Sequence, residues 1–280
     1  MKILISSRGG YCYGVQRALD IAHDAASDSQ GPIHTLGPII HNPGVVNRLA
    51  EAGVSPVDKP SQVESGTLIL RTHGVTPQVI AEAKERGIRI VDATCPYVKV
   101  AQEKASSLQQ QGYLPIILGE HEHPEVVALV ANAGERAAVV ENAEELKIGT
   151  VKGKKVGVVV QTTQASGNLA ALAARLAPAC RELLIHNTMC NATQKCQDEA
   201  LKLARKADAV IVIGGRNSAN TTRLAQLCAE VQPRTHHIED VEELQPEWFA
   251  GAGTVAITAG ASTPPEQMDA AARWLEDNSP

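Results

Sequence analysis

The sequence is poor in aromatic side chains, because its 280 residues include only two Trp, four Tyr and one Phe. Proteins that bind single-stranded nucleic acid stack bases on such rings, so this class is disfavoured. An excess of positive charge is also missing, since 26 basic and 31 acidic residues give a net charge of −5. Nucleic-acid binders carry a basic surface, so both features argue against that class.

Long apolar runs are missing as well. No stretch approaches the roughly 20 apolar residues that a membrane span needs. The apolar run within Met1–Arg8 is too short for a signal peptide and predicts a strand. We therefore expect a cytoplasmic protein. Its 44% of apolar residues and 20% of charged residues allow a packed core, and its length favours two domains, with one or three allowed.

The sequence has no C-x-x-C motif, and a chain this long does not need disulfides to form a core. Unpaired cysteines are packing residues, nucleophiles or metal ligands. The six cysteines are Cys12, Cys95, Cys180, Cys190, Cys196 and Cys228.

Three of these cysteines mark an internal repeat. Cys12, Cys95 and Cys190 each follow a short strand-like run and precede a stretch with helical periodicity. After a further 28 or 29 residues, a second apolar run has ended in a polar loop, at His41, His123 and Ser218. A third run then ends in another polar loop, at residues 72–74, 161–163 and 259–263. The last copy lacks its closing strand, which the N-terminal run 2–5 can supply.

This alternation predicts an α/β fold with parallel sheets covered by helices on both faces. We expect three units, at residues 13–95, 96–190 and 191–280, the last completed by residues 1–12. Ligands bind beyond the carboxyl ends of such strands. If the units pack around a pseudo-threefold axis, the three cysteines and the polar loops converge on one cavity. The stretch 51–66, which contains Pro56 and Pro60, is predicted to be a surface loop.

Thiolates near helix N-termini suit a metal centre, because the helix dipole stabilises their negative charge. Soft sulfur ligands select zinc, Cu(I) or an iron–sulfur cluster. Three of them leave one coordination position open for catalysis. The alternative is three buried packing cysteines, which the matched repeat positions disfavour. Cys180, Cys196 and Cys228 have no repeat partners and are predicted to be packing residues.

The loops carry histidines and small polar residues, which form an anion site when they gather at helix N-termini. They are His41, His73, His123, Glu125, Thr162, Ser218, Asn220 and Ser262. No Lys or Arg recurs among them, so histidines and backbone N–H groups would supply the positive potential. Asn42 and Glu125 also have ordinary alternatives, as an N-cap and as an acid at a helix start. An acid beside an open metal site suits a proton donor. Reduction and redox-neutral dehydration both remain open on these grounds.

At these loops the chain resembles the 4-hydroxy-3-methylbut-2-enyl diphosphate reductases, the IspH/LytB family. The matching motifs, in family order, are residues 10–15 (GYCYGV), 36–42 (LGPIIHN), 72–74 (THG), 92–96 (DATCP), 123–126 (HPEV), 161–163 (QTT), 190–193 (CNAT), 217–220 (NSAN) and 259–262 (AGAS). The resemblance implies a trefoil of three α/β domains around a [4Fe–4S] cluster held by Cys12, Cys95 and Cys190.

The resemblance also implies the remaining roles. The substrate-binding residues would be His41, His73, His123, Thr162, Ser218, Ala219, Asn220 and Ser262. Glu125 would be the proton-relay acid, with Thr162 near the substrate hydroxyl and His123 beside it. The implied reaction is a two-electron reductive dehydroxylation that yields isopentenyl and dimethylallyl diphosphate, the last step of the non-mevalonate pathway.

The chain differs from other members of the family it resembles at three positions: Ala219 stands where some members carry Ser, Cys196 where many carry Arg, and Gln16 where others carry an acid or Lys. Two other functions are compatible with such a site: a hydro-lyase that uses iron as a Lewis acid, and a non-catalytic iron–sulfur sensor. A sensor has no use for Glu125 or a diphosphate pocket. The sequence has no G-x-G-x-x-G nicotinamide motif, so we expect ferredoxin or flavodoxin as the electron donor, and a monomer.

Overall fold

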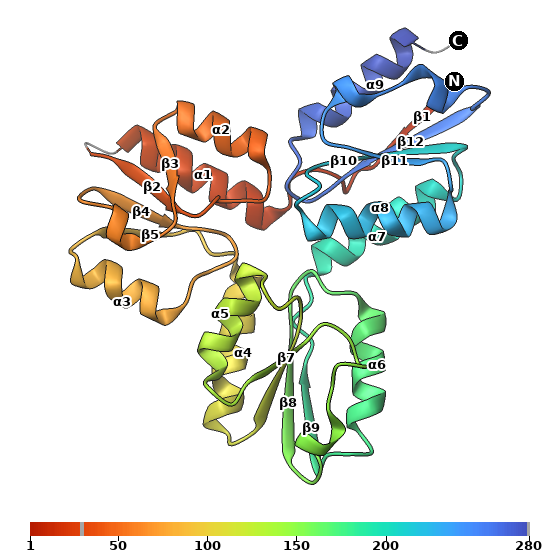
Figure 1. The fold of residues 1–280 in the computed structure, drawn as a ribbon. Helices are drawn as coiled ribbons and strands as arrows, with labels where there is room; N and C mark the ends of the chain where they lie inside the picture. The colour runs from red at the N-terminus through yellow and green to blue at the C-terminus, as the bar shows by residue number, and fades with distance from the viewer. Residues whose placement is uncertain (29–30, 279–280) are drawn as a thin grey trace. The chain divides into compact units, whose positions relative to one another are not determined.

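The computed structural model describes residues 1–28 and 31–278 (Figure 1). Contacts divide the chain into two compact units. Unit 1 comprises Met1–Gln16, Ile40–Leu49 and the chain from Asn191 onward, and unit 2 comprises Arg17–Ile39 and Ala50–Cys190. The predicted boundaries at 13–95, 96–190 and 191–280, of which residues 279 and 280 lie outside the described part, stay a prediction.

The α/β class with parallel sheets is confirmed, because the described strands form three four-stranded sheets in which every pairing is parallel. Unit 1 contains β1 (Lys2–Ile5), β12 (Thr254–Ala259), β10 (Ala209–Ile213) and β11 (Thr235–Ile238), in that order across the sheet. Unit 2 contains β5 (Arg89–Asp92), β4 (Thr67–Leu70), β2 (Ile33–Leu36) and β3 (Val54–Val57) in one sheet. Its other sheet has β9 (Glu182–His186), β8 (Lys155–Val160), β6 (Leu114–Leu118) and β7 (Ala138–Val140).

The three sheets therefore repeat one plan, in which each strand has a counterpart in the other two. β1, β5 and β9 occupy one edge, and β3, β7 and β11 occupy the other. The N-terminal strand completes the sheet of unit 1 by pairing with β12, with Lys2 opposite Thr254. Parallel strands place their carboxyl ends at one edge of each sheet, which is where the predicted site residues lie.

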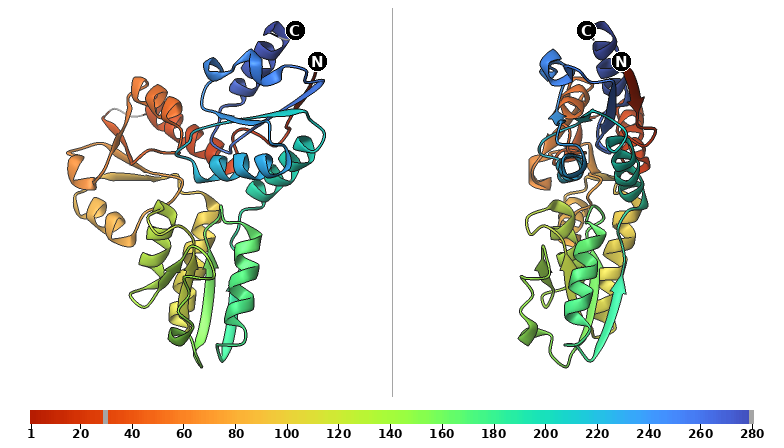
Figure 2. Two further views of the ribbon diagram at one scale, coloured as in Figure 1. Left: turned by 45° about the vertical axis from the view of Figure 1, so that its right-hand side comes forward. Right: turned by 90° about the vertical axis from the view of Figure 1, so that its right-hand side faces the viewer.

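Helices connect the strands and cover both faces of the sheets (Figures 1 and 2). They are α1 (Tyr13–Asp28), α2 (Pro43–Glu51), α3 (Pro77–Glu85), α4 (Pro96–Gln110), α5 (Pro124–Ala133), α6 (Ser166–Leu176), α7 (Asn191–Ala204), α8 (Ala219–Val231) and α9 (Pro265–Asn278). Short 3₁₀ turns are η1 (Pro60–Gln62), η2 (Ile148–Thr150), η3 (Val241–Glu243) and η4 (Pro246–Phe249). None of the described helices has both the length and the apolar character that crossing a bilayer requires.

Alternating side chains of the central strands build a core on each side of a sheet. In unit 1, Ile211 of β10 packs in the core that includes Leu275 of α9, whereas Val212 packs with Leu224 of α8. The second sheet of unit 2 repeats this pattern, with α6 on one face and α4 and α5 on the other. The sheets are thus buried on both faces, which explains the continuous apolar runs of their strands.

The predicted loop at 51–66 is wrong in part, because it contains β3 and η1. β3 pairs with β2, with Val54 opposite Ile33. Pro56 within β3 is tolerated because β3 is an edge strand, where a missing backbone N–H costs no ladder bond. The equivalent edge strands β7 and β11 were not predicted either.

Candidate functional site

The three repeat cysteines occupy equivalent places in the three sheets. Cys95 is the N-cap of α4, and Cys12 and Cys190 each directly precede a helix. In each case the cysteine N–H donates a hydrogen bond to the carbonyl of the second residue after the neighbouring strand. These bonds join Cys12 to Ala261 (3.0 Å), Cys95 to Thr72 (3.0 Å) and Cys190 to Thr162 (2.8 Å). The sheet therefore fixes the backbone of each cysteine in the same way.

These cysteines have the chemistry that an iron–sulfur cluster requires. None of the three forms a disulfide, and all three are only partly buried. Thiolates are the usual ligands of such clusters. By contrast, burial raises the pKa of Cys196 to about 12 and that of Cys228 to about 11, which keeps both as inert thiols. The residues present fit the implied cluster.

Cys196 is buried in the core between α7, α8 and the sheet of unit 1. Its Sγ lies 3.6 Å from the carbonyl oxygen of Ala259, to which it can donate a weak hydrogen bond. It packs as an apolar residue, as predicted from its lack of repeat partners.

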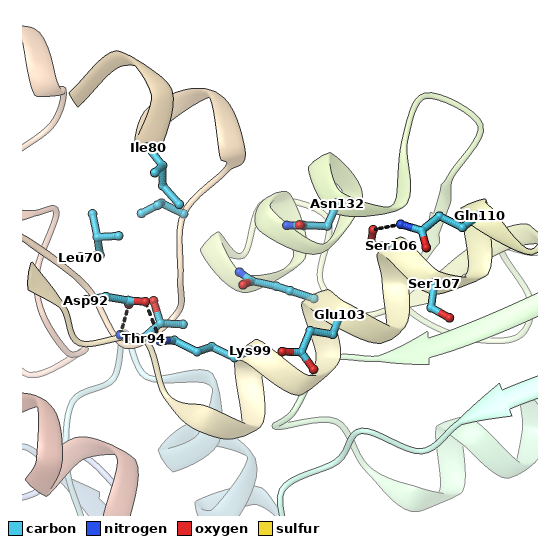
Figure 3. A pocket seen from close by; sticks show the side chains of 12 residues that line it. Leu70, Ile80, Asp92, Thr94, Lys99, Glu103, Ser106, Ser107, Gln110 and Asn132 are labelled. Carbon is cyan, nitrogen blue, oxygen red and sulfur yellow. Dashed lines mark hydrogen bonds and ion pairs between the residues drawn. The ribbon is translucent and has the colours of Figure 1, made fainter. Parts of the chain in front are cut away.

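The turn before Cys95 is held by charged and polar side chains. Asp92 accepts a hydrogen bond from the Thr94 N–H (2.9 Å) and forms an ion pair with Lys99 (2.6 Å). These contacts lower the pKa of Asp92, although its partial burial acts in the opposite direction. The three residues line a cavity of about 520 Å³ beside α4, which also includes Gln102 and Asn132 (Figure 3). No predicted site residue lines this cavity.

Unit 2 contains a buried carboxyl group at the start of α5. Glu125 is only 1% exposed, and both of its oxygens accept hydrogen bonds from Thr162 at the end of β8. The Thr162 N–H donates to Oε1 and the hydroxyl donates to Oε2, each at 2.7 Å. Burial raises the pKa of Glu125 to about 7; the Thr162 bonds lower it and the nearby Glu120 raises it. Both protonation states are therefore accessible near neutral pH, as an acid–base catalyst requires.

Two histidines lie next to this acid. His123 is the N-cap of α5, and its Nδ1 accepts the Glu125 N–H at 3.1 Å. An Nδ1 that accepts a hydrogen bond leaves the proton of the neutral ring on Nε2, which can donate. The ring of His73 meets that of His123 edge-on, with ring centroids 5.4 Å apart. Unit 2 thus brings together His73, His123, Glu125 and Thr162.

In unit 1, His41 lies beside the loop that follows β12. The Ser262 hydroxyl donates to the His41 carbonyl oxygen (3.3 Å), and the Asn42 side-chain amide donates to the Ser262 carbonyl (3.1 Å). Asn42 Oδ1 also accepts the Val45 N–H (3.1 Å), so Asn42 caps α2. This hydrogen-bond pair holds His41 and Ser262 together.

The remaining predicted residues of unit 1 lie at the start of α8. Ser218 is the N-cap and accepts the Thr221 N–H at 3.4 Å. Ala219 and Asn220 are the first two residues of the helix. Asn220 is buried, and within residues 1–28 and 31–278 its side-chain Nδ2 has no hydrogen-bond partner. A buried unpaired donor is costly, so a ligand acceptor at this helix start would satisfy it.

Two residues of these loops were missed by the sequence interpretation. Gln161 follows β8 and is 1% exposed; its Oε1 accepts the Glu120 N–H and its Nε2 donates to Thr163, each at 2.9 Å. Arg71 holds the equivalent place after β4. Both residues come directly after the third strand of a repeat, and this position is the feature of the sequence that could have identified them.

Comparison with known proteins gives a consistent result. The model of the LytB protein family matches residues 3–276. The 4-hydroxy-3-methylbut-2-enyl diphosphate reductase of Pelobacter propionicus is 47% identical over 277 residues, 99% of this chain and 95% of the relative. The enzyme of the same name from Geobacter metallireducens is 46% identical with the same coverage.

Solved structures agree over nearly the whole chain. One is (E)-4-hydroxy-3-methyl-but-2-enyl diphosphate reductase, the terminal enzyme of the non-mevalonate pathway, with 38% identity and a TM-score of 0.75 over 99% of this chain and 100% of that one. Another is the E-1-hydroxy-2-methyl-but-2-enyl-4-diphosphate reductase of Plasmodium falciparum, with 26% identity and a TM-score of 0.89 over 98% and 87%.

Proposed function

Because the chain belongs to the LytB protein family, we propose that it reduces 4-hydroxy-3-methylbut-2-enyl diphosphate to isopentenyl diphosphate and dimethylallyl diphosphate. This is the final step of the non-mevalonate route to isoprenoids. The match covers residues 3–276, and relatives at 46–47% identity carry the name of this activity. The proposed reaction takes up two electrons and two protons, breaks the carbon–hydroxyl bond, and forms one C–H bond and one water.

We assign Cys12, Cys95 and Cys190 as ligands of a [4Fe–4S] cluster. The absence of disulfides at these cysteines and their equivalent backbone positions support the assignment. When bound, such a cluster supplies electrons one at a time and has an iron that lacks a cysteine ligand. Convergence of the three cysteines on one cluster stays a prediction.

We assign the diphosphate to the polar loops that begin the helices. The predicted ligands are His41, His73, His123, Ser218, Asn220 and Ser262, with the Ala219 backbone beside them. The orphan Asn220 amide supports this assignment, because it offers a hydrogen bond to an anion. The missing hydroxyl at Ala219 leaves its backbone N–H as its polar group there.

The observation that carries the proposal is the Glu125–Thr162 pair. A buried carboxyl with a pKa of about 7 is protonated for part of the time at neutral pH. Glu125 can pass its proton to Thr162 Oγ1 while that hydroxyl gives its own proton to the substrate. The 2.7 Å contact allows such a transfer without movement of either side chain. His123 fixes the start of α5 and so holds Glu125 in place.

The proposal extends to the setting of the enzyme. The chain has no nicotinamide-binding motif, so we propose ferredoxin or flavodoxin as the electron donor. We further propose that it works as a monomer in the cytoplasm, acting on a small diphosphate without nucleic acid or membrane partners. The acidic net charge supports the exclusion of nucleic acid.

The proposal is tested by anaerobic purification, iron and sulfide analysis, and turnover with the hydroxylated diphosphate and a chemical reductant. We expect about four irons per chain, water release, and two electrons consumed per product. Product formation without electron uptake would contradict reduction and favour a hydro-lyase. A cluster-loaded protein that does not turn over this diphosphate would contradict the proposed substrate.

A further inference from the structure

Arg71 is the first residue after β4, two residues before His73. Its side chain crosses the turn at Gly37, which follows β2. A Cβ added to Gly37 would lie 2.6 Å from the guanidinium Nη1, so the Arg71 side chain passes directly over this glycine. Gly37 also has a φ of +67°, which disfavours other residues. The guanidinium therefore lies at the carboxyl ends of β2 and β4, the edge from which the His73 loop leaves.

This guanidinium has no partner in the part of the chain that the structure describes. Arg71 Nε is buried without a hydrogen bond, and no ion pair or other side-chain hydrogen bond forms at this residue. Burial lowers the pKa of Arg71, and no nearby carboxylate offsets the effect. Buried charges in proteins are normally paired and hydrogen-bonded. Arg71 is half-buried, and its buried Nε is a donor that solvent or a ligand would have to satisfy.

The equivalent residue of the next sheet has an obvious structural role. Gln161 follows β8 and lies over Gly119, where an added Cβ would come within 2.7 Å of its Oε1. That oxygen accepts the N–H of Glu120, the residue after the glycine. Gln161 therefore braces the loop that leads to the catalytic acid.

Arg71 is unable to brace its loop in this way. The residue after Gly37 is Pro38, which has no backbone N–H, and a guanidinium donates hydrogen bonds but accepts none. The bracing that explains Gln161 thus leaves Arg71 unexplained. A fork of N–H donors beside a predicted anion-binding histidine is suited to phosphate oxygens.

We infer that Arg71 is a further substrate-binding residue, which supplies a full positive charge to the diphosphate beside His73. The inference rests on the proposed function and adds to it a charge that histidines alone do not provide. The charge assists binding, and the carbon–oxygen bond is broken elsewhere, so Arg71 affects KM more than kcat.

The test compares R71Q with the control R86Q in the cluster-loaded enzyme. Arg86 lies at the exposed end of α3, where it donates to the Ser61 carbonyl. KM and kcat are measured with the hydroxylated diphosphate, and the Kd of inorganic pyrophosphate is measured by calorimetry. We expect R71Q to raise both KM and Kd about ten- to a hundredfold, with kcat within a few-fold of wild type. R86Q should change none of the three.

Unchanged KM and pyrophosphate affinity in R71Q would overturn the inference, and a lower melting temperature alone would show that Arg71 only packs over Gly37. If R71Q does not fold, R71M keeps the aliphatic stem and carries the same test. If R71Q and R71M both fail to fold while R71K folds, the inference is also overturned, because the positive charge of Arg71 is then needed for folding. If wild type binds pyrophosphate through Arg71 but does not reduce the substrate, the proposed function fails and the anion site stands.

Discussion

The loop before α5 in unit 2 and the loop before α8 in unit 1 have the same framework but different chemistry. Each follows the second strand of its copy and begins a helix with a side-chain N-cap, His123 in one and Ser218 in the other. The second residue of each helix is buried, and it is Glu125 in unit 2 and Asn220 in unit 1. One framework therefore presents an acid in one copy and an amide in another.

The surroundings of the two side chains match this difference. Thr162 donates hydrogen bonds to both oxygens of Glu125, whereas the Asn220 Nδ2 has no partner among the described residues. The acid is already satisfied and exchanges protons near pH 7, while the amide has a donor left for a ligand. A repeat can thus be specialised by one side chain per copy, because strand, cap and helix are inherited together.

Substitution of the three repeat cysteines tests whether the three copies contribute equally to the proposed cluster. Replacing Cys12, Cys95 or Cys190 with Ser removes one soft ligand, and we expect each variant to lose most of its iron and all measurable turnover. Iron and sulfide analysis after anaerobic purification measures the loss.

Cys180→Ser and Cys228→Ser serve as matched controls and should keep the cluster. Cys228 is buried in the core of unit 1, so its variant is also checked for folding. A wild-type iron content in Cys95→Ser would show that the second copy contributes no ligand.

Glu125→Gln converts the acid into the amide type found in the other copy. General acid catalysis contributes about 10²–10⁴-fold, so we expect kcat to fall by about that factor. Gln is nearly isosteric, so iron content and pyrophosphate affinity should persist. Steady-state kinetics with a chemical reductant provide the measurement, and near-wild-type kcat would remove Glu125 from the proton relay.

Asn220→Ala removes the amide that lacks a partner. Loss of a hydrogen bond to a charged group lowers affinity about ten- to a hundredfold, so KM and the pyrophosphate Kd should rise by that factor. Unlike Glu125→Gln, this variant should keep kcat. A fall in kcat with unchanged KM would mean that the amide acts on the reacting centre, and the contrast between the copies would break down.

The dependence of kcat/KM on pH also distinguishes the two loops. Glu125 has a pKa raised to about 7 from 4.5, so its acid form is complete at low pH and is lost as the pH rises through about 7. We expect kcat/KM, which reports the free enzyme, to fall about tenfold per pH unit above that value. Asn220 does not titrate, so the fall of kcat/KM at high pH should persist in Asn220→Ala and should disappear in Glu125→Gln.

Much of the architecture could be predicted from the repeat. The spacing of the cysteines indicated the parallel sheets and the pairing of the N-terminal strand with the last one. The edge strands β3, β7 and β11 were not predicted, although β1, β5 and β9 at the opposite edge were, because their residues do not form clear apolar runs. β7 has three residues, β3 contains Pro56, and β11 carries His236 and His237.

The positions of the candidate site residues at the strand ends could also be predicted from the repeat. Spacing alone aligned His41 with His123 and Ser218, whereas the helix starts align Asn42 with these two N-caps. Counting residues does not reveal this single-residue difference, because it depends on where a helix begins. Arg71 was overlooked because a single charged residue after a strand is ordinary in sequence, and its lack of a partner is visible only once the chain is folded.

The pairing of β1 with β12 has a consequence for synthesis of the protein. The two strands meet with Lys2 opposite Thr254, so about 250 residues are translated between them. At roughly 5–20 residues per second this takes about 10–50 s. During that time Ile3 and Leu4 have no sheet to join, although the sheets of unit 2 can already form. The sheet of unit 1, and the backbone of Cys12 with it, is therefore completed only at the end of translation.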